Sequence, residues 1–96
     1  MKVVWSSRAE EAIGKIKLYL IDNWSEKVAD NFIKEVGEKI EILKRFPDIG
    51  RVSSIDGSVK KILIVKHLLL YYRVKKNKLE ILDFFDQHQD PDKANY

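Results

Sequence analysis

The sequence predicts an α+β domain of order β-α-α-β-β-β, in which a helical hairpin packs on one face of a mostly antiparallel sheet. Apolar residues recur every three to four positions through two consecutive stretches of the first half, which is the period of a helix facing a core. The second half contains three strand-like runs, SVKKILIV, LLLYYRV and LEILDFF. We expect a single domain over residues 1–96, with residues 86–96 as a polar tail.

The first strand and the first helix are expected at the start of the chain. Residues 2–5, KVVW, are typical of a short strand. Ser6 or Ser7 is the expected helix cap, and Ser7 with Glu10 fits a capping box, in which both side chains satisfy free backbone N–H groups. The helix is expected to end near Asn23. Its apolar face comprises Ala9, Ile13, Ile16, Leu20 and Trp24.

The second helix is expected to follow at once. Ser25 is its predicted cap, and Pro47 with Gly50 is expected to end it. The link of residues 23–25 is so short that the two helices must form an antiparallel hairpin. The apolar stripe of this helix comprises Val28, Phe32, Val36, Ile40 and Leu43.

Residues 47–57 are the one long loop expected in the chain. Three strands are predicted after it, at about 58–65, 68–75 and 78–85. Asn77 suits the turn between the last two strands because asparagine tolerates positive φ. Lys66 and His67 would form the other turn.

Composition restricts the class of protein. The apolar share of 45% is ordinary for a globular chain. The absence of cysteine excludes disulfides and thiolate sites and is compatible with the cytoplasm. The start has no hydrophobic region long enough for a signal peptide, and no apolar run approaches the ~18 residues of a membrane span. We therefore expect a soluble cytoplasmic protein with no membrane partner and no cofactor.

Charge is distributed unevenly along the chain, whose net charge is +3. Residues 1–50 are balanced, residues 51–82 carry eight basic and two acidic side chains, and residues 83–96 carry four aspartates and one lysine. The strand region is therefore electropositive, which favours nucleic acid, phosphate or an acidic protein segment as a partner. Lysines that protect a sheet edge from aggregation explain the same count equally well.

Both faces of the predicted sheet carry large apolar residues. With two-residue turns at 66–67 and 76–77, the face toward the helices is expected to carry Val59, Leu63, Val65, Leu68, Leu70, Tyr72, Val74, Leu79 and Ile81. The other face is expected to carry Ile62, Ile64, Leu69, Tyr71, Leu82 and Phe84. An apolar patch of that size is rarely left wet on a monomer. We expect the C-terminal tail, a second copy or a foreign peptide to cover it, and the tail is too polar to do so well.

A charged row is expected at one end of this second face. Lys60 opposite Arg73 would be a destabilising like-charge pair, which Glu80 partly offsets. The row is either a structural ion-pair row or an anion site beside Tyr71 and Tyr72.

The inventory of catalytic groups is short. His67 and His88 are the side chains whose ordinary pKa lies near neutrality. A metal site is not expected, because His, Asp and Glu are not clustered at ligand spacing. RNA cleavage without a metal needs a base, cations for the phosphorane charge and an acid. Lys60, Lys61 and Arg73 could supply the cations, and His88 could move protons.

Four segments together resemble the RelE/ParE superfamily of bacterial toxins. They are V-x-W-S-x-x-A near the start, LKRFPDIGR after the second helix, VKKILIVKHLLLYYRV in the sheet, and IL-x-x-FD-x-x-QDP-x-K at the end. The resemblance spans nearly the whole chain, and the ParE branch is closer. It implies the β-α-α-β-β-β fold and the toxin half of a type II toxin–antitoxin pair. It also implies neutralisation by a small antitoxin that lies along the toxin surface.

The ParE-like resemblance implies growth inhibition through binding of DNA gyrase. The expected target-binding residues are Arg51, Lys60, Lys61, Tyr71, Arg73 and His88. The expected antitoxin-binding residues are Ile62, Ile64, Leu69, Leu82 and Phe84.

Two alternatives stay open. The RelE branch implies a metal-independent endoribonuclease that cuts messenger RNA on the ribosome, although Asp83 and Phe84 stand where the nucleases tend to place an arginine. The catalytic candidates for that reaction are Lys60, Lys61, Arg73 and His88. The other alternative is an inactive relative that only binds its antitoxin in operon regulation. A homodimer in the absence of the antitoxin is a further expectation.

Overall fold

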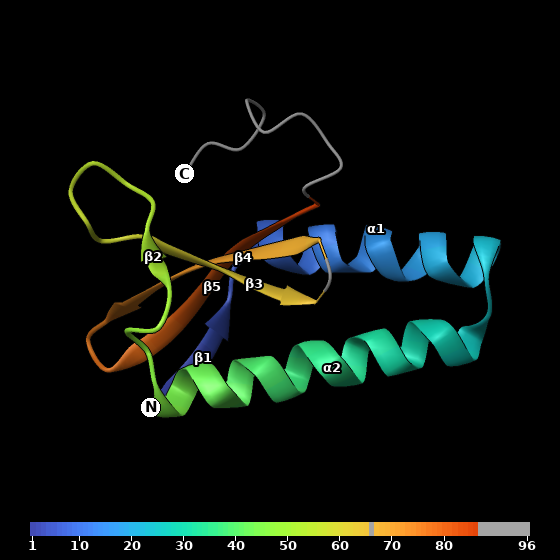
Figure 1. Ribbon diagram of the computed structural model, residues 1–96, viewed down its shortest axis with the longest axis horizontal. Helices are drawn as coiled ribbons and strands as arrows, with labels where there is room; N and C mark the ends of the chain where they lie inside the picture. Colours follow the sequence, from blue (N-terminus) through green and yellow to red (C-terminus); the bar gives the residue numbers. More distant parts are fainter. Residues whose placement is uncertain (66, 87–96) are drawn as a thin grey trace.

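The structure is a computed structural model of the 96-residue chain and describes residues 1–65 and 67–86. The helices form an antiparallel hairpin, with α2 beneath the sheet and α1 alongside β5 (Figure 1). The expected fold class is confirmed, with β2 as an additional strand. The elements are β1 (Lys2–Trp5), α1 (Ser7–Asn23), α2 (Glu26–Arg45), β2 (Arg51–Val52), β3 (Lys60–Val65), β4 (Leu68–Lys75) and β5 (Lys78–Asp86).

Serine caps begin both helices. The Ser25 Oγ accepts a hydrogen bond from the Val28 N–H at 3.1 Å, as expected. For α1 the cap is Ser6, whose Oγ accepts from the Ala9 N–H at 2.9 Å, so the capping box expected from Ser7 is wrong. The Ser6 hydroxyl also donates to the Leu82 carbonyl at 2.7 Å, which fastens the start of α1 to β5. Neither helix is long and apolar enough to cross a membrane.

The sheet has the order β1-β5-β4-β3-β2, with β1 parallel to β5 and the other pairs antiparallel. Lys76 and Asn77, between β4 and β5, both have positive φ, which confirms the tight turn expected at Asn77. β2 lies within the segment expected to be a loop and pairs with β3 through two residues, Arg51 opposite Lys61 and Val52 opposite Lys60.

Two β-bulges change the strand register from the one obtained by counting. Leu63 lies opposite Leu69, and the register then shifts so that Val65 lies opposite Leu68. In the next pair Tyr72 lies opposite Ile81, whereas Tyr71 lies opposite Asp83. An extra residue in one strand moves the following side chains to the other face. Counting from two-residue turns places Leu63 opposite Leu70 and Tyr71 opposite Leu82, and both of these expected pairs are therefore wrong.

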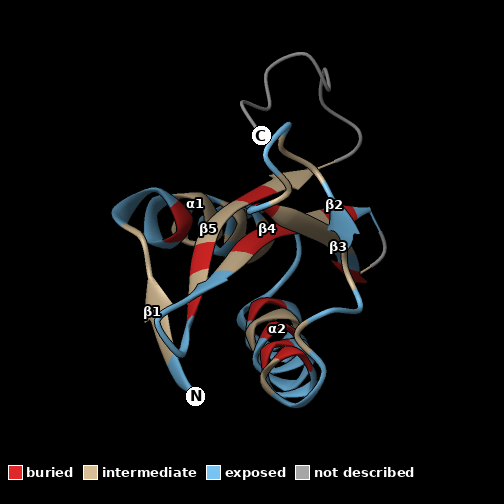
Figure 2. Cartoon of the chain, turned by 90° about the vertical axis from the view of Figure 1, so that its left-hand side faces the viewer, coloured by how far each residue is buried: buried red, intermediate tan, exposed pale blue. Residues whose placement is uncertain are grey.

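The hydrophobic core fills the space between the sheet and the helices (Figure 2). Its buried residues are Ala9, Val36, Ile40, Leu43, Ile64, Leu68, Leu70, Tyr72, Leu79, Ile81 and Phe84. Trp5 packs against this cluster, with its ring centroid 5.4 Å from that of Phe84.

The core assignment corrects the expected faces. Ile64 and Phe84 are buried in the core and Ile62 packs against it, so these three do not belong to the face away from the helices. Leu63, expected in the core, is instead 50% exposed. We call the sheet face away from α2 the second face. Its residues include Lys61, Leu63, Leu69, Tyr71, Arg73 and Glu80.

The apolar surface of the second face is smaller than the sequence predicted. Tyr71 is 4% exposed, and Leu69 and Leu82 are half-buried. Leu63 is the most exposed of these side chains.

Candidate functional site

A row of polar side chains crosses the second face. Lys61 of β3 lies opposite Arg51 of β2 on one side and Tyr71 of β4 on the other. Tyr71 in turn lies opposite Asp83 of β5. Directly opposed residues share a face of a sheet, so these four side chains form one line across four strands. The row brings together three of the residues predicted to bind a target.

The phenol of Tyr71 occupies the middle of the row. Burial, and secondarily the negative charge of Asp83, raise the pKa of Tyr71 above its ordinary value. The phenol is therefore protonated at neutral pH and can donate a hydrogen bond. Asp83 is also held by Arg8 of α1, whose Nε lies 3.1 Å from the carboxylate.

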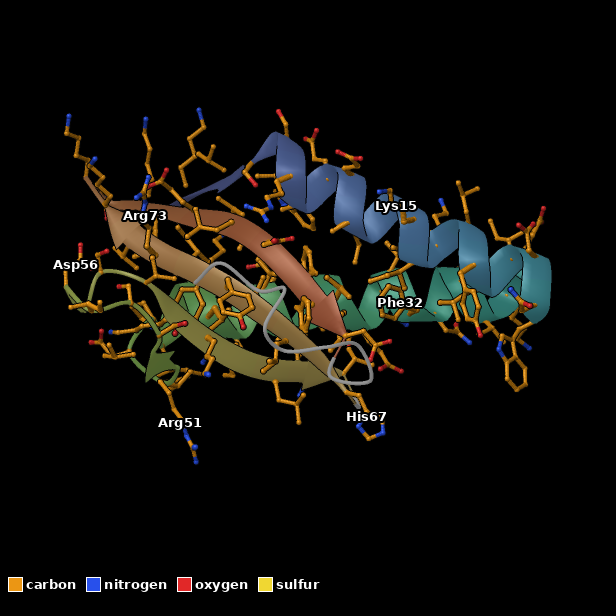
Figure 3. All side chains as sticks on the ribbon, turned by 90° about the horizontal axis from the view of Figure 1, so that it is seen from above. Lys15, Phe32, Arg51, Asp56, His67 and Arg73 are labelled. Atoms are coloured by element: carbon orange, nitrogen blue, oxygen red, sulfur yellow. The ribbon has the colours of Figure 1, made fainter. Side chains whose placement is uncertain are left out.

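Two cations of the row remain available to a partner. Arg51 is exposed on the short edge strand, and Lys61 is half-buried beside it. Neither makes an ion pair with another residue in the described part of the chain. Figure 3 views the molecule from above and places Arg51 at one edge of the sheet, its side chain directed outward.

Arg73 lies at the end of the second face and is engaged by Glu80 across the β4–β5 ladder. Its Nε lies 2.8 Å from one carboxylate oxygen, and a second guanidinium nitrogen lies 3.4 Å from the other. This hydrogen bonding lowers the pKa of Glu80 despite its partial burial. The expected Arg73–Glu80 pair is thus confirmed.

Lys60 does not belong to the charged row that was expected with Arg73 and Glu80. It lies opposite Tyr72 rather than Arg73, because the register differs from the expected one. Its Nζ lies 2.7 Å from the Asp48 carboxylate, a contact that raises the pKa of Lys60. The expected like-charge pair of Lys60 and Arg73 was therefore wrong.

The loop before β2 is anchored by the hydroxyl of the fully buried Tyr72. This hydroxyl donates to the Pro47 carbonyl at 2.8 Å and accepts from the Gly50 N–H at 2.9 Å. A Cβ on Gly50 would collide with the Tyr72 hydroxyl and lie 3.0 Å from the Lys61 carbonyl. The FP-x-x-G segment thus sets where Arg51 enters the sheet.

An apolar row runs parallel to the polar one. Leu63 lies opposite Leu69, which lies opposite Phe85 of β5. A cavity of about 370 Å³ opens beside it at the outer side of β3. Its lining residues are Ile49, Arg51, Lys61, Ile62, Leu63 and Leu69. Beyond Lys61, this side of β3 has no strand partner among residues 1–65 and 67–86.

Several features of the site were not found from the sequence. Arg8 and Phe85 were not predicted as site residues, and Leu63 was assigned to the wrong face. A bulge leaves no clear signal in a run such as ILIV, where every residue is apolar. His88 lies outside the described residues. The described part of the chain contains no group of three or more His, Cys, Asp or Glu able to hold a metal ion.

Residues 3–91 match the family model of the ParE toxin of the type II toxin–antitoxin system parDE. The chain belongs to the ParE toxin family. No curated protein matched the sequence.

Two solved structures share the ParE fold seen here. One, "Chromosomal ParDE TA system from P. aeruginosa", has a TM-score of 0.78 at 18% identity, over 90% of this chain and 95% of that chain. The other is a solution structure of the conserved hypothetical protein HP0894 from Helicobacter pylori. It has a TM-score of 0.59 at 18% identity, over 93% of this chain and 97% of that chain.

Within this ParE toxin the polar row offers two cations, Arg51 and Lys61, to a partner. Its tyrosine is held in the neutral form and is only 4% exposed. The two cations are suited to contacting acidic groups of a partner.

Proposed function

We propose that this ParE toxin arrests growth by binding DNA gyrase through the second face of its sheet. The observation that carries the proposal is the row Arg51–Lys61–Tyr71, in which two neighbouring cations make no ion pair with a described residue and lie to one side of the buried, protonated phenol. Arginine is enriched at the energetically dominant positions of protein interfaces. Membership of the ParE family supports gyrase as the partner.

A cognate antitoxin neutralises the toxin by covering the apolar row beside that site. The half-exposed Leu63 and the adjoining cavity accept apolar side chains of the antitoxin. The outer side of β3 beyond Lys61 offers backbone groups to an extended segment, which can add as a further strand. Because the cavity also includes Arg51 and Lys61, a segment seated there blocks the polar row.

Induction of the toxin without its antitoxin tests the proposed activity. Growth should stop and chromosomal breaks should accumulate while messenger RNA remains intact. Messages cut within codons at the ribosome would instead identify a RelE-like nuclease. Unaffected growth at a normal level of folded protein would identify an inactive relative, and either result contradicts the proposal.

Leu63→Asp tests the place of the antitoxin, with Leu18→Asp as the matched control. Leu18 lies on α1, away from the row, and is 61% exposed against 50% for Leu63. A buried carboxylate in the antitoxin interface is costly, so Leu63→Asp should weaken the complex at least tenfold in a calorimetric titration. Equal affinities of the two variants would place the antitoxin elsewhere.

A further inference from the structure

The sheet register gathers three lysines into one row at the end of the sheet where β1 begins and β4 turns into β5. Lys78 of β5 lies opposite Lys2 of β1 on one side and Lys75 of β4 on the other. All three are exposed. Lys76 follows in the tight turn with φ of 52°, and is exposed too. We call Lys2, Lys75 and Lys78 the lysine row.

This arrangement is unfavourable for the isolated chain. Like charges directly opposite one another in a sheet are destabilising. No member of the lysine row has an ion-pair partner among residues 1–65 and 67–86. Glu80 is the nearest acid, but its pKa is lowered chiefly by the hydrogen bond from Arg73 and only secondarily by Lys75 and Lys78, so it is already engaged. The charge of the row is therefore left to the solvent or to an anionic partner.

Protection of a sheet edge explains only part of the row. Lysines on exposed edge strands discourage pairing with another chain, and this can apply to Lys2 on the edge strand β1 and to Lys75, which lies beyond the pairing of β4 with β3. Lys78, however, is flanked by paired strands on both sides and has no free edge to protect. Its position between two other lysines calls for a different reason.

The lysine row has a definite length. Arg73, labelled in Figure 3, lies two positions before Lys75 but is engaged by Glu80, so the row itself supplies the free charge. Neighbouring strands are about 4.8 Å apart, so the lysine row is about 10 Å wide. A line of positive charge of this length suits a linear polyanion better than a single phosphate group.

The residue types indicate what the polyanion is. Protein interfaces are depleted in lysine, whereas Lys78 has lysines opposite it on both sides and Lys76 is exposed in the adjoining turn. Lysine ammonium groups bind phosphates as mobile point charges, without the fixed geometry of a base-reading arginine. We infer that the lysine row binds the phosphodiester backbone of nucleic acid without regard to base sequence. This contact is separate from the gyrase and antitoxin contacts proposed above and does not depend on them.

Salt-dependent binding to a short labelled DNA duplex tests this inference. Fluorescence anisotropy would compare the wild type with the triple variant Lys2→Gln, Lys75→Gln, Lys78→Gln, over salt from about 50 to about 200 mM. The matched control is Lys27→Gln, Lys34→Gln, Lys39→Gln, which removes the same charge from exposed positions of α2 that make no ion pair with a described residue. A second series would use single-stranded RNA, and a third vesicles of phosphatidylserine and phosphatidylcholine.

Each phosphate contact contributes about 0.9 to the slope of log K against log salt for duplex DNA, and about 0.7 for a single strand. Loss of the lysine row should therefore reduce the slope by about 2.7 on duplex DNA or about 2.1 on RNA, with the control near the wild type. The larger of the two affinities shows which nucleic acid is preferred. The inference is overturned if the wild type binds neither, if both triple variants lose slope equally, or if the row affects binding to vesicles alone.

Discussion

At the scale of single residues, two adjacent tyrosines of β4 have different roles. Because side chains alternate along a strand, Tyr71 and Tyr72 point to opposite faces. Tyr72 is fully buried and its hydroxyl bonds Pro47 and Gly50, so it holds the loop that leads to β2. Tyr71 lies between Lys61 and Asp83 on the second face. Tyr72 therefore anchors the loop, and Tyr71 lies buried beside the cations of the proposed binding surface.

Gly50→Ala should destabilise the fold by about 1–3 kcal/mol, the usual cost of overpacking. Its new methyl group would meet the Tyr72 ring, 2.8 Å from Cε1, and the backbone of β3. Gly37→Ala is the matched control, since nothing lies within 4 Å of its added Cβ. That substitution, within α2, should stabilise by about 1 kcal/mol. Urea unfolding would measure both, and shifts of the same sign would contradict this account of Gly50.

Asp56 should titrate well below other aspartates. Its Oδ1 accepts hydrogen bonds from the hydroxyls of Ser54 and Ser58, both at 2.7 Å, and from the Ser58 N–H. These bonds lower the pKa of Asp56 from 3.8 to about 2, the Ser54 bond most of all. Because the folded pKa is the lower one, the stabilisation is present above about pH 4 and is lost as the pH falls toward 2.

An NMR pH titration of the Asp56 carboxylate checks this value. Ser54→Ala should raise the midpoint, because it removes the largest contribution. Ser53→Ala is the control, since the Ser53 hydroxyl is buried without a described hydrogen-bond partner and does not contact Asp56. A wild-type midpoint near 3.8 would show that the Ser54 and Ser58 bonds do not form in solution.

At the scale of elements, the Ser6 cap joins a helix to the sheet. Ser6→Ala should cost more stability than Ser25→Ala, although both remove a cap worth about 1 kcal/mol. The additional loss for Ser6 comes from the Leu82 carbonyl, which would be left without the 2.7 Å hydrogen bond from Ser6. Thermal unfolding of the two variants measures the difference. Equal losses would mean that the Ser6–Leu82 bond adds nothing.

The elements themselves followed from local sequence signals, but their faces did not. Ser25, the helical stripes and Asn77 gave the helices and the last turn nearly to the residue. Which face of a strand is buried depends on whether its odd or its even positions are apolar. In ILIV or LLLYY both sets are apolar, so the pattern does not show which side is buried. Two bulges then decided it, which is why Ile64 and Phe84 lie in the core and Leu63 does not.

The candidate site was predictable in part for a related reason. Residue type identified Arg51, Lys61, Tyr71 and Arg73 as able to bind an anionic or polar partner. The arrangement of the first three in one row required the register of two strand pairs, which sets long-range contacts that no local pattern encodes. Lys60 shows the limit, because a shift of one position moved it to the Asp48 side of the sheet.

At the scale of the whole molecule, the two sides of the sheet have different roles. The helices and β-strands enclose a single core on one side, which fixes the fold. The other side carries the polar row, the apolar row and the lysine row, each made from residues of different strands. A short chain thus presents three neighbouring surfaces on one rigid sheet, and we propose that gyrase, the antitoxin and nucleic acid are their respective partners.

Inhibition of gyrase by purified charge-reversal variants tests the central claim most directly. In a DNA supercoiling assay the wild-type toxin should inhibit gyrase, and Lys61→Glu should lose at least tenfold in potency because it reverses one of the two cations of the polar row. Lys34→Glu, the same change on the exposed surface of α2, should inhibit like the wild type. Undiminished inhibition by a folded Lys61→Glu toxin would contradict the assignment of the second face as the working surface.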